Sequence, residues 1–276
     1  MKKHQAEVER GQRFQFGENW LSFLGVLNED RIAVAVKSLQ KMLGVDTLQN
    51  KTFLDVGSGS GLFSLAARRL GAIVYSFDYD PQSVACTKEL KRRYYLEDEE
   101  WVVEEGSALD NDYLIQLGQF DVVYSWGVLH HTGAMWEALE NVALRVKPDG
   151  AKLFIAIYND EGLLSRFWLI VKKVFNHSLI GRYSVKAIFY PWFVIRAILV
   201  GVKDYNNPFG KFINYQKQRG MSIVRDWDDW LGGYPFEVAS VEELFKFYKL
   251  KGFDLINIKT TNRLGCNELV FESVRS

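Results

Sequence analysis

Three glycines within five residues give this sequence its clearest chemical signal. Gly57, Gly59 and Gly61 follow the apolar run 52–56, and an apolar helical pattern begins at Leu62. Glycine lets the backbone adopt positive φ angles and lets a ligand approach closely. The unpaired N–H groups at the start of the following helix attract an anionic group. The spacing therefore predicts a strand, a ligand-binding turn and a helix.

The same turn argues against two common nucleotide-binding classes. The dinucleotide fingerprint G-x-G-x-x-G requires a glycine three positions after the second one, but Leu62 stands there. A P-loop requires a Gly-Lys-Ser/Thr sequence, which does not follow this turn. A nicotinamide-dependent oxidoreductase is therefore an alternative that Leu62 opposes.

An acidic residue follows the next apolar run, at 72–77. Asp78 stands about 20 residues after the glycine turn, at the expected end of a second parallel strand. In doubly wound sheets, ligands bind at the carboxyl ends of strands, and an acid at this position accepts ribose hydroxyls. We therefore expect Asp78 to bind a ribose and Tyr79 to lie against an adenine. Asp80, before Pro81, is expected to cap the next helix.

The glycine turn and the residues after it resemble motif I of the class I methyltransferases that use S-adenosylmethionine (SAM). The resemblance covers residues 50–158 and 240–272. Within this class, the chain resembles the small-molecule methyltransferases related to the ubiquinone and menaquinone biosynthesis enzymes. It implies SAM as the cofactor. The cofactor-binding residues expected from this part of the chain are Asp55, Gly57, Ser58, Gly59, Gly61, Leu62, Phe63, Asp78 and Tyr79.

The resemblance also implies cofactor contacts from other parts of the chain. Ser107 and Ala108, after a third strand at 101–105, match the position that binds the adenine, although Ser replaces the commoner Asp. An N-terminal helical arm is common over the cofactor in these enzymes, although an arm that only packs on the core is an equal alternative. The methionine end of SAM is expected to lie along Ser125, Trp126 and Gly127. The arm is expected to contact the cofactor through Phe16, Asn19 and Trp20.

Two adjacent histidines follow the fourth strand. His131 is predicted as the catalytic base, because imidazole titrates near neutrality and an oxygen or carbon acceptor requires proton removal more than an amine does. The alternative is a histidine that bonds to the backbone and shapes the loop. Substrate contacts are expected from His130, Tyr158, Asn159, Arg225, Asp226, Trp230 and Tyr234.

Strand and helix patterns alternate up to residue 158, which predicts a parallel sheet with helices on both faces. The pattern resumes at Ser240 with a capping box, followed by two strands that resemble the antiparallel edge of class I methyltransferase sheets. The prediction is an α/β fold with a doubly wound, mostly parallel, seven-stranded sheet. We expect an N-terminal helical arm at 1–50, a Rossmann-like core at 51–158 and 240–276, and a helical lid at 159–239.

The lid concentrates positive charge. Residues 159–225 contain eleven Lys or Arg and three Asp or Glu, a balance of +8 in a chain whose formal net charge is zero. The run 180–202 is almost wholly apolar, but Arg182, Lys186 and Arg196 oppose a membrane-spanning helix. A narrow basic stripe on an apolar helix fits either a lid packed on the core or a helix lying in a membrane interface.

Composition limits the partners and the compartment. Equal numbers of basic and acidic residues, 34 each, give no global argument for nucleic acid. Cys86 and Cys266 can build neither a disulfide framework nor a zinc site, so no metal is expected. The N-terminus has no apolar signal core. We expect a cytoplasmic protein, with peripheral membrane contact through 163–203.

The sequence therefore predicts a SAM-dependent methyltransferase acting on an oxygen or carbon atom of a small, amphiphilic or anionic metabolite. Two alternatives remain open. One is a methyltransferase that acts on RNA or protein, since the basic, aromatic lid could hold a phosphate chain. The other is a non-catalytic module that binds SAM or a membrane surface. The oligomeric state is not predicted.

Overall fold

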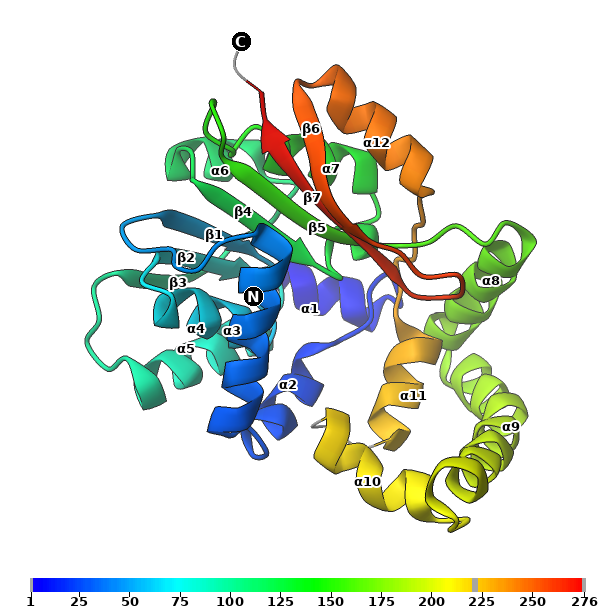
Figure 1. Ribbon diagram of the computed structural model, residues 1–276. Coiled ribbons are helices and arrows are strands. Elements are labelled where there is room, and N and C mark those ends of the chain that lie inside the picture. The colour runs from blue at the N-terminus through cyan, green and yellow to red at the C-terminus, as the bar shows by residue number, and fades with distance from the viewer. Residues whose placement is uncertain (1, 220–222, 275–276) are drawn as a thin grey trace.

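One mixed sheet organises the molecule. The computed structural model describes residues 2–219 and 223–274, without the side chains at positions 2, 18, 19, 21, 22 and 216–219. Within these residues, seven strands pair in the order β3-β2-β1-β4-β5-β7-β6, with β7 antiparallel to both neighbours (Figure 1). This confirms the predicted fold class. The strands are β1 Thr52–Val56, β2 Ile73–Asp78, β3 Trp101–Glu105, β4 Val122–Trp126, β5 Lys152–Tyr158, β6 Phe253–Lys259 and β7 Cys266–Ser273.

Helices cover both faces of the sheet, and this explains why the central strands read as continuous apolar runs. Phe53 of β1 packs on the side of α3, α4 and α5, whereas its neighbour Leu54 belongs to the cluster on the side of α6, α7 and α12 (Figure 1). These helices are α3 Glu29–Leu43, α4 Leu62–Arg69, α5 Pro81–Tyr94, α6 Asn111–Leu117, α7 Met135–Ala143 and α12 Val241–Leu250.

Two local signals that predicted helix starts are confirmed, and a glycine ends a third helix. The Asp80 carboxylate accepts a hydrogen bond of 2.9 Å from the Gln82 N–H at the start of α5. At α12, Ser240 and Glu243 form the predicted reciprocal capping box. Gly44 ends α3 in the left-handed region, at φ 65°, where glycine carries no steric penalty.

The chain between β5 and α12 forms a separate helical layer beyond the carboxyl ends of β4 and β5 (Figure 1). Its helices are α8 Leu163–His177, α9 Leu179–Tyr205, α10 Gly210–Arg219 and α11 Ile223–Gly232. An aromatic cluster that includes Trp168, Phe175 and Phe193 joins α8, α9 and α11. Among the described residues, α9 is the one helix long and apolar enough to cross a membrane, and 22% of its most apolar window is buried.

The N-terminal helical arm is also present. Helices α1 (Lys2–Glu9) and α2 (Gly17–Leu24) lie at the carboxyl ends of the strands, between the sheet and the helical layer (Figure 1). The Phe14 N–H donates a hydrogen bond of 2.8 Å to the Tyr234 carbonyl oxygen, which ties the arm to the segment after α11. The arm therefore contacts both the sheet and the helical layer.

Candidate active site

The glycine turn after β1 has the tight geometry that its sequence predicts. Gly57, Gly59 and Gly61 all have positive φ angles, of 80°, 55° and 78°. A Cβ atom at Gly57 would stand 2.4 Å from a methyl carbon of Val128, so a larger residue does not fit there. Gly61 is the N-cap of α4, and no side chain caps this helix end. The turn therefore directs the N-terminus of α4 toward the end of the sheet.

Asp78, at the end of β2, faces this turn. Its two carboxylate oxygens accept hydrogen bonds of 2.9 Å from the N–H groups of Gly59 and Asp80. A carboxylate has about four acceptor positions, so positions remain for hydroxyl donors. Burial raises the pKa of Asp78 to about 6. The predicted ribose-binding carboxylate therefore stands beside the glycine turn.

Asp55 lies deeper in the fold than Asp78. Its carboxylate is buried and accepts a hydrogen bond of 2.5 Å from the Ser64 hydroxyl on α4. Burial raises the pKa of Asp55 to about 7. Its contact with Ser64 fixes the first turn of α4 to β1, and its predicted cofactor role stays a prediction.

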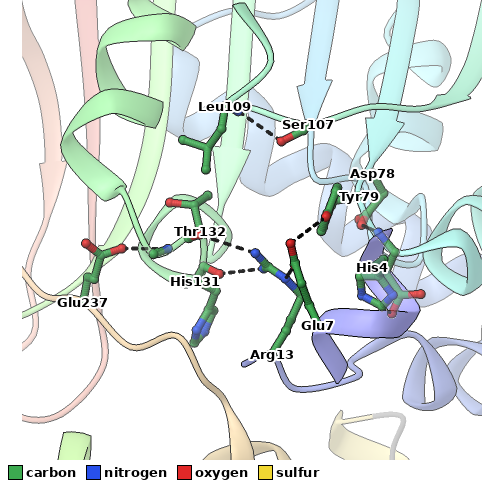
Figure 2. Close-up of polar contacts among 12 residues, drawn as sticks. His4, Glu7, Arg13, Asp78, Tyr79, Ser107, Leu109, His131, Thr132 and Glu237 are labelled. Atoms are coloured by element: carbon green, nitrogen blue, oxygen red, sulfur yellow. Dashed lines mark hydrogen bonds and ion pairs between the residues drawn. The ribbon is translucent and has the colours of Figure 1, made fainter. Parts of the chain in front are cut away.

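The N-terminal arm reaches across the strand ends (Figure 2). The Tyr79 hydroxyl donates a hydrogen bond of 3.1 Å to one oxygen of Glu7, and Arg13 donates one of 2.9 Å to the other. The Arg13 guanidinium lies 4.8 Å above the centre of the Tyr79 ring and also donates to the His131 carbonyl oxygen at 2.8 Å. The arm thus connects the loops after β2 and β4. Neither Glu7 nor Arg13 was predicted from the sequence.

The predicted arm residues have different positions. Trp20 lies against the glycine turn, because a Cβ atom at Gly59 would stand 3.2 Å from its ring. Phe16 packs on His131, with ring centres 5.0 Å apart. The side chain of Asn19 lies outside the described residues. The arm therefore places one ring near the cofactor turn and one near the proposed base.

The remaining predicted cofactor residues keep local partners. The Ser107 hydroxyl accepts a hydrogen bond of 3.2 Å from the Leu109 N–H (Figure 2), and the buried Ser125 hydroxyl donates one of 3.0 Å to the Val56 carbonyl oxygen. The remaining members of this group are Ser58, Leu62, Phe63, Ala108, Trp126 and Gly127. Phe63 and Trp126 line a cavity of about 140 Å³ beside α3. Their cofactor contacts stay predictions.

The two histidines occupy the short 3₁₀ helix Leu129–His131 and are buried. The His131 Nδ1 atom lies 2.5 Å from the Pro235 carbonyl oxygen. Because a carbonyl only accepts, we assign the proton to Nδ1, which leaves a lone pair on Nε2. Burial lowers the pKa of His131 to about 3, so its imidazole is neutral at physiological pH. His131 therefore bonds to the backbone, as expected for a histidine that shapes the loop. Its Nε2 atom can still accept a hydrogen bond.

The ring of His130 packs against the ring of His131, with the two ring centres 4.4 Å apart. Its Nδ1 atom accepts a hydrogen bond of 3.4 Å from the Tyr158 N–H, and the Tyr158 ring lies 4.1 Å away, centre to centre. Its Nε2 atom is buried and has no hydrogen-bond partner within the described part of the chain. His130 thus adds an unsatisfied polar atom to this end of the sheet.

Lys172, on α8, lies beside the histidines, although the sequence did not predict it there. Its side chain is fully buried, and its ammonium donates a hydrogen bond to the Trp230 carbonyl oxygen. The ammonium lies 4.6 Å from the centre of the Trp230 ring and 4.9 Å from that of Phe236. Burial lowers the pKa of Lys172 to about 7, and its charge further lowers the pKa values of His130 and His131. The available signal was its position among the apolar residues of α8, four after Trp168.

The predicted substrate residues separate into two groups. Trp230 packs on Tyr158, with ring centres 6.1 Å apart, and so belongs with His131 and Lys172. Tyr234 lies beside the arm, as its bond to Phe14 shows. In contrast, Asn159 bonds to Asn267, Asp226 accepts from the Tyr215 hydroxyl, and Arg225 is exposed on α11. The structure therefore does not bring Asn159, Asp226 and Arg225 into the histidine cluster.

The strand order, the antiparallel β7 and the glycine turn after β1 together define a class I SAM-dependent methyltransferase fold. The hydrogen-bonding groups around the glycine turn fit the cofactor of this class. Asp78 offers acceptor positions for ribose hydroxyls, and the N-terminus of α4 offers N–H groups for a carboxylate.

The known proteins that this chain resembles are also methyltransferases. Residues 54–151 match the family model described as a methyltransferase domain. A ribosomal protein L11 methyltransferase of Alteromonas mediterranea is 48% identical over 56 residues, which are 20% of this chain and 19% of that protein. A ubiquinone biosynthesis O-methyltransferase of Coxiella burnetii is 29% identical over 119 residues, 41% of this chain and 46% of that protein. The chain spans less than half the length of each relative.

A solved structure shows the same fold over most of the chain. Magnesium protoporphyrin IX methyltransferase from Synechocystis PCC 6803, with bound SAH, has a TM-score of 0.52 and 14% sequence identity. The match covers 90% of this chain and 88% of that one. The core of this chain therefore has the fold of that methyltransferase, and residues 54–151 match a methyltransferase domain.

Proposed function

We propose that the chain transfers a methyl group from SAM to an oxygen or carbon atom of a small, amphiphilic or anionic acceptor. The observation that carries the proposal is the cluster of His131, Tyr158, Lys172 and Trp230, next to the carboxyl ends of β4 and β5. This cluster adjoins the loop after β4, where the resemblance puts the methionine end of SAM. Aromatic rings and a buried cation suit a planar acceptor that carries negative charge.

The chain would hold and enclose the cofactor with groups already described. Asp78 binds the ribose hydroxyls, Tyr79 lies against the adenine, and the N-terminus of α4 faces the carboxylate. SAM supplies an electrophilic methyl group on a sulfonium. The N-terminal arm, held by Glu7 and Arg13, covers the strand ends and excludes water.

Proton removal from the acceptor is assigned to His131. Its Nε2 atom carries a lone pair over the physiological range, because burial keeps the imidazole neutral. It can accept a hydrogen bond from an acceptor hydroxyl and take the proton as the hydroxyl oxygen forms its bond to carbon. The ammonium of Lys172 stabilises negative charge that develops on the acceptor.

The names of the two relatives point to different acceptors: one names a ribosomal protein, and the other names ubiquinone biosynthesis. The enclosed cluster favours the small acceptor, because the side chains of His131 and Lys172 are buried. A protein acceptor would have to insert one side chain between the arm and α8. If the acceptor is a protein, the transferred methyl group will be found in macromolecules.

The test is methyl transfer from radiolabelled SAM into an extract of the source cells, followed by separation into acid-precipitable and small-molecule fractions. We expect label in small molecules, and a loss of this label with Asp78→Asn or His131→Asn. Label in the precipitate would support an RNA or protein acceptor. SAH binding without any label transfer would support a non-catalytic module.

A further inference from the structure

Large apolar side chains form a stripe on the solvent side of α8. Its four side chains follow one another at intervals of four, three and four positions. They therefore lie within about 60° of one another around a helix that turns about 100° per residue. The opposite side of α8 carries the buried Trp168, Lys172 and Phe175. The exposed stripe consists of Leu163, Phe167, Ile170 and Val174.

A second stripe runs along α9. Its buried side carries Val185, Phe193 and Ala197, which pack toward the interior of the helical layer. Its exposed side chains recur at spacings of seven, four and three residues, also within about 60°. They are Ile188, Ile195, Leu199 and Val202, each between 49% and 68% exposed. Packing inside the protein therefore does not account for the apolar character of α9.

Exposed cations border both stripes. Arg166 and Lys173 lie about 60–100° to one side of the α8 stripe, and Arg196 and Lys203 lie about 70–90° to one side of the α9 stripe. Within the described residues, none of these four forms a salt bridge, whereas Lys186 of α9 pairs with Asp228 at 2.7 Å. Each of the two helices thus carries an exposed apolar stripe with exposed cations to one side of it.

We propose that the α8–α9 surface docks on an anionic lipid bilayer, with both helices in the plane of the interface. An apolar stripe bordered by Lys and Arg is the pattern of interfacial helices, which are attracted by anionic lipids. Trp192, half exposed on α9 and about 50° from the centre of its stripe, is a residue type that favours headgroup depth. The opposite face of α8 carries Lys172, so docking places the acceptor cluster behind the bound surface.

The structure favours a lipid surface over two other occupants. A second copy of the chain, related by a two-fold axis, would bring the same four cations together and repel. A helix spanning the bilayer would have to leave the aromatic cluster, to which α9 contributes Val185 and Phe193. The proposal concerns binding alone and does not depend on methyl transfer.

The test is flotation of the full chain with vesicles of phosphatidylcholine, with and without 30% phosphatidylglycerol by composition. We expect binding to the anionic vesicles that weakens with salt. Ile195→Glu combined with Leu199→Glu should lower the partition coefficient by about tenfold or more, because both side chains would have to leave the bilayer as charges. The matched control is Val34→Glu combined with Leu250→Glu, two exposed apolar residues on α3 and α12.

Four results would overturn the proposal. They are absence of flotation with either vesicle, equal losses in the stripe and control variants, retention after an alkaline carbonate wash, and a lipid-free dimer that Leu199→Glu dissociates. Unchanged circular dichroism and SAH binding would show that the variants fold. Quenching of tryptophan emission by brominated lipids, reduced in Trp192→Phe, provides an independent measurement of the docked face.

Discussion

Arg13 donates a hydrogen bond of 2.8 Å to the backbone carbonyl oxygen of His131, 118 positions later in the chain. The same guanidinium pairs with Glu7 and lies over the Tyr79 ring. One side chain of the arm therefore holds the loops after β2 and β4 together above the glycine turn. We therefore expect exchange of a bound cofactor to require these contacts to open.

Arg13→Ala should loosen the N-terminal arm. A hydrogen bond to a charged group contributes about 1.5–3 kcal/mol, so amide exchange in residues 2–16 and SAH dissociation should each accelerate by about ten- to a hundredfold. Hydrogen exchange and stopped-flow fluorescence measure the two rates. Arg10→Ala, an exposed arginine on the same arm, is the control. Equal rates in the two variants would show that Arg13 does not hold the arm.

Asp78→Asn should weaken SAH binding by about ten- to a hundredfold, because ribose hydroxyls lose a charged acceptor. The pKa of about 6 adds a pH test, since protonation removes acceptor positions. Wild-type affinity should fall as the pH drops below about 6, and the affinity of the variant should stay level. Calorimetry at pH 5 and pH 8 measures both, with Asp112→Asn as a surface control. Equal pH dependence in both proteins would remove Asp78 from the ribose site.

The sequence predicted those parts of the site that short-range patterns determine. The strand, glycine turn and helix around Gly59 lie within one βαβ unit, and Asp78 follows from the next strand end. Lys172 could not be predicted in the same way, because its burial depends on how α8 packs against α11 and the loop after it. Arg13 likewise became a site residue only through a contact across the fold. The basic stripe of α9 could be predicted from the spacing, but which sides of α9 are exposed and buried could not.

Asp55→Asn should change the pH dependence of stability. The folded-state pKa of about 7 is above the usual 3.8, so Asp55 favours folding when protonated, and this contribution disappears as the pH rises through 7. The unfolding free energy of the wild type, relative to the variant, should fall by about 2–3 kcal/mol between pH 5 and pH 8. The variant keeps an oxygen for the Ser64 hydroxyl. Urea denaturation at both pH values would contradict the prediction if the difference stayed constant.

Lys172→Met should change stability in the opposite pH direction. Burial lowers the pKa of Lys172 from 10.5 to about 7, so the unfolded chain binds the proton more tightly between these values. The unfolding free energy of the wild type, relative to the variant, should therefore rise by about 2 kcal/mol between pH 7 and pH 9. Lys173→Met, the exposed neighbour on α8, should follow the wild type.

The same pair of variants separates a packing role from a role in the reaction. Removing a buried amine that only fills space would leave the pH profile of methyl transfer unchanged, whereas a cation facing the acceptor adds an inflection near pH 7. His131 cannot produce this inflection, because its pKa of about 3 keeps it neutral throughout the range. An inflection near pH 7 that persists in Lys172→Met would therefore come from another group, such as Asp55, Asp78 or the acceptor, and Lys172 would be left with packing alone.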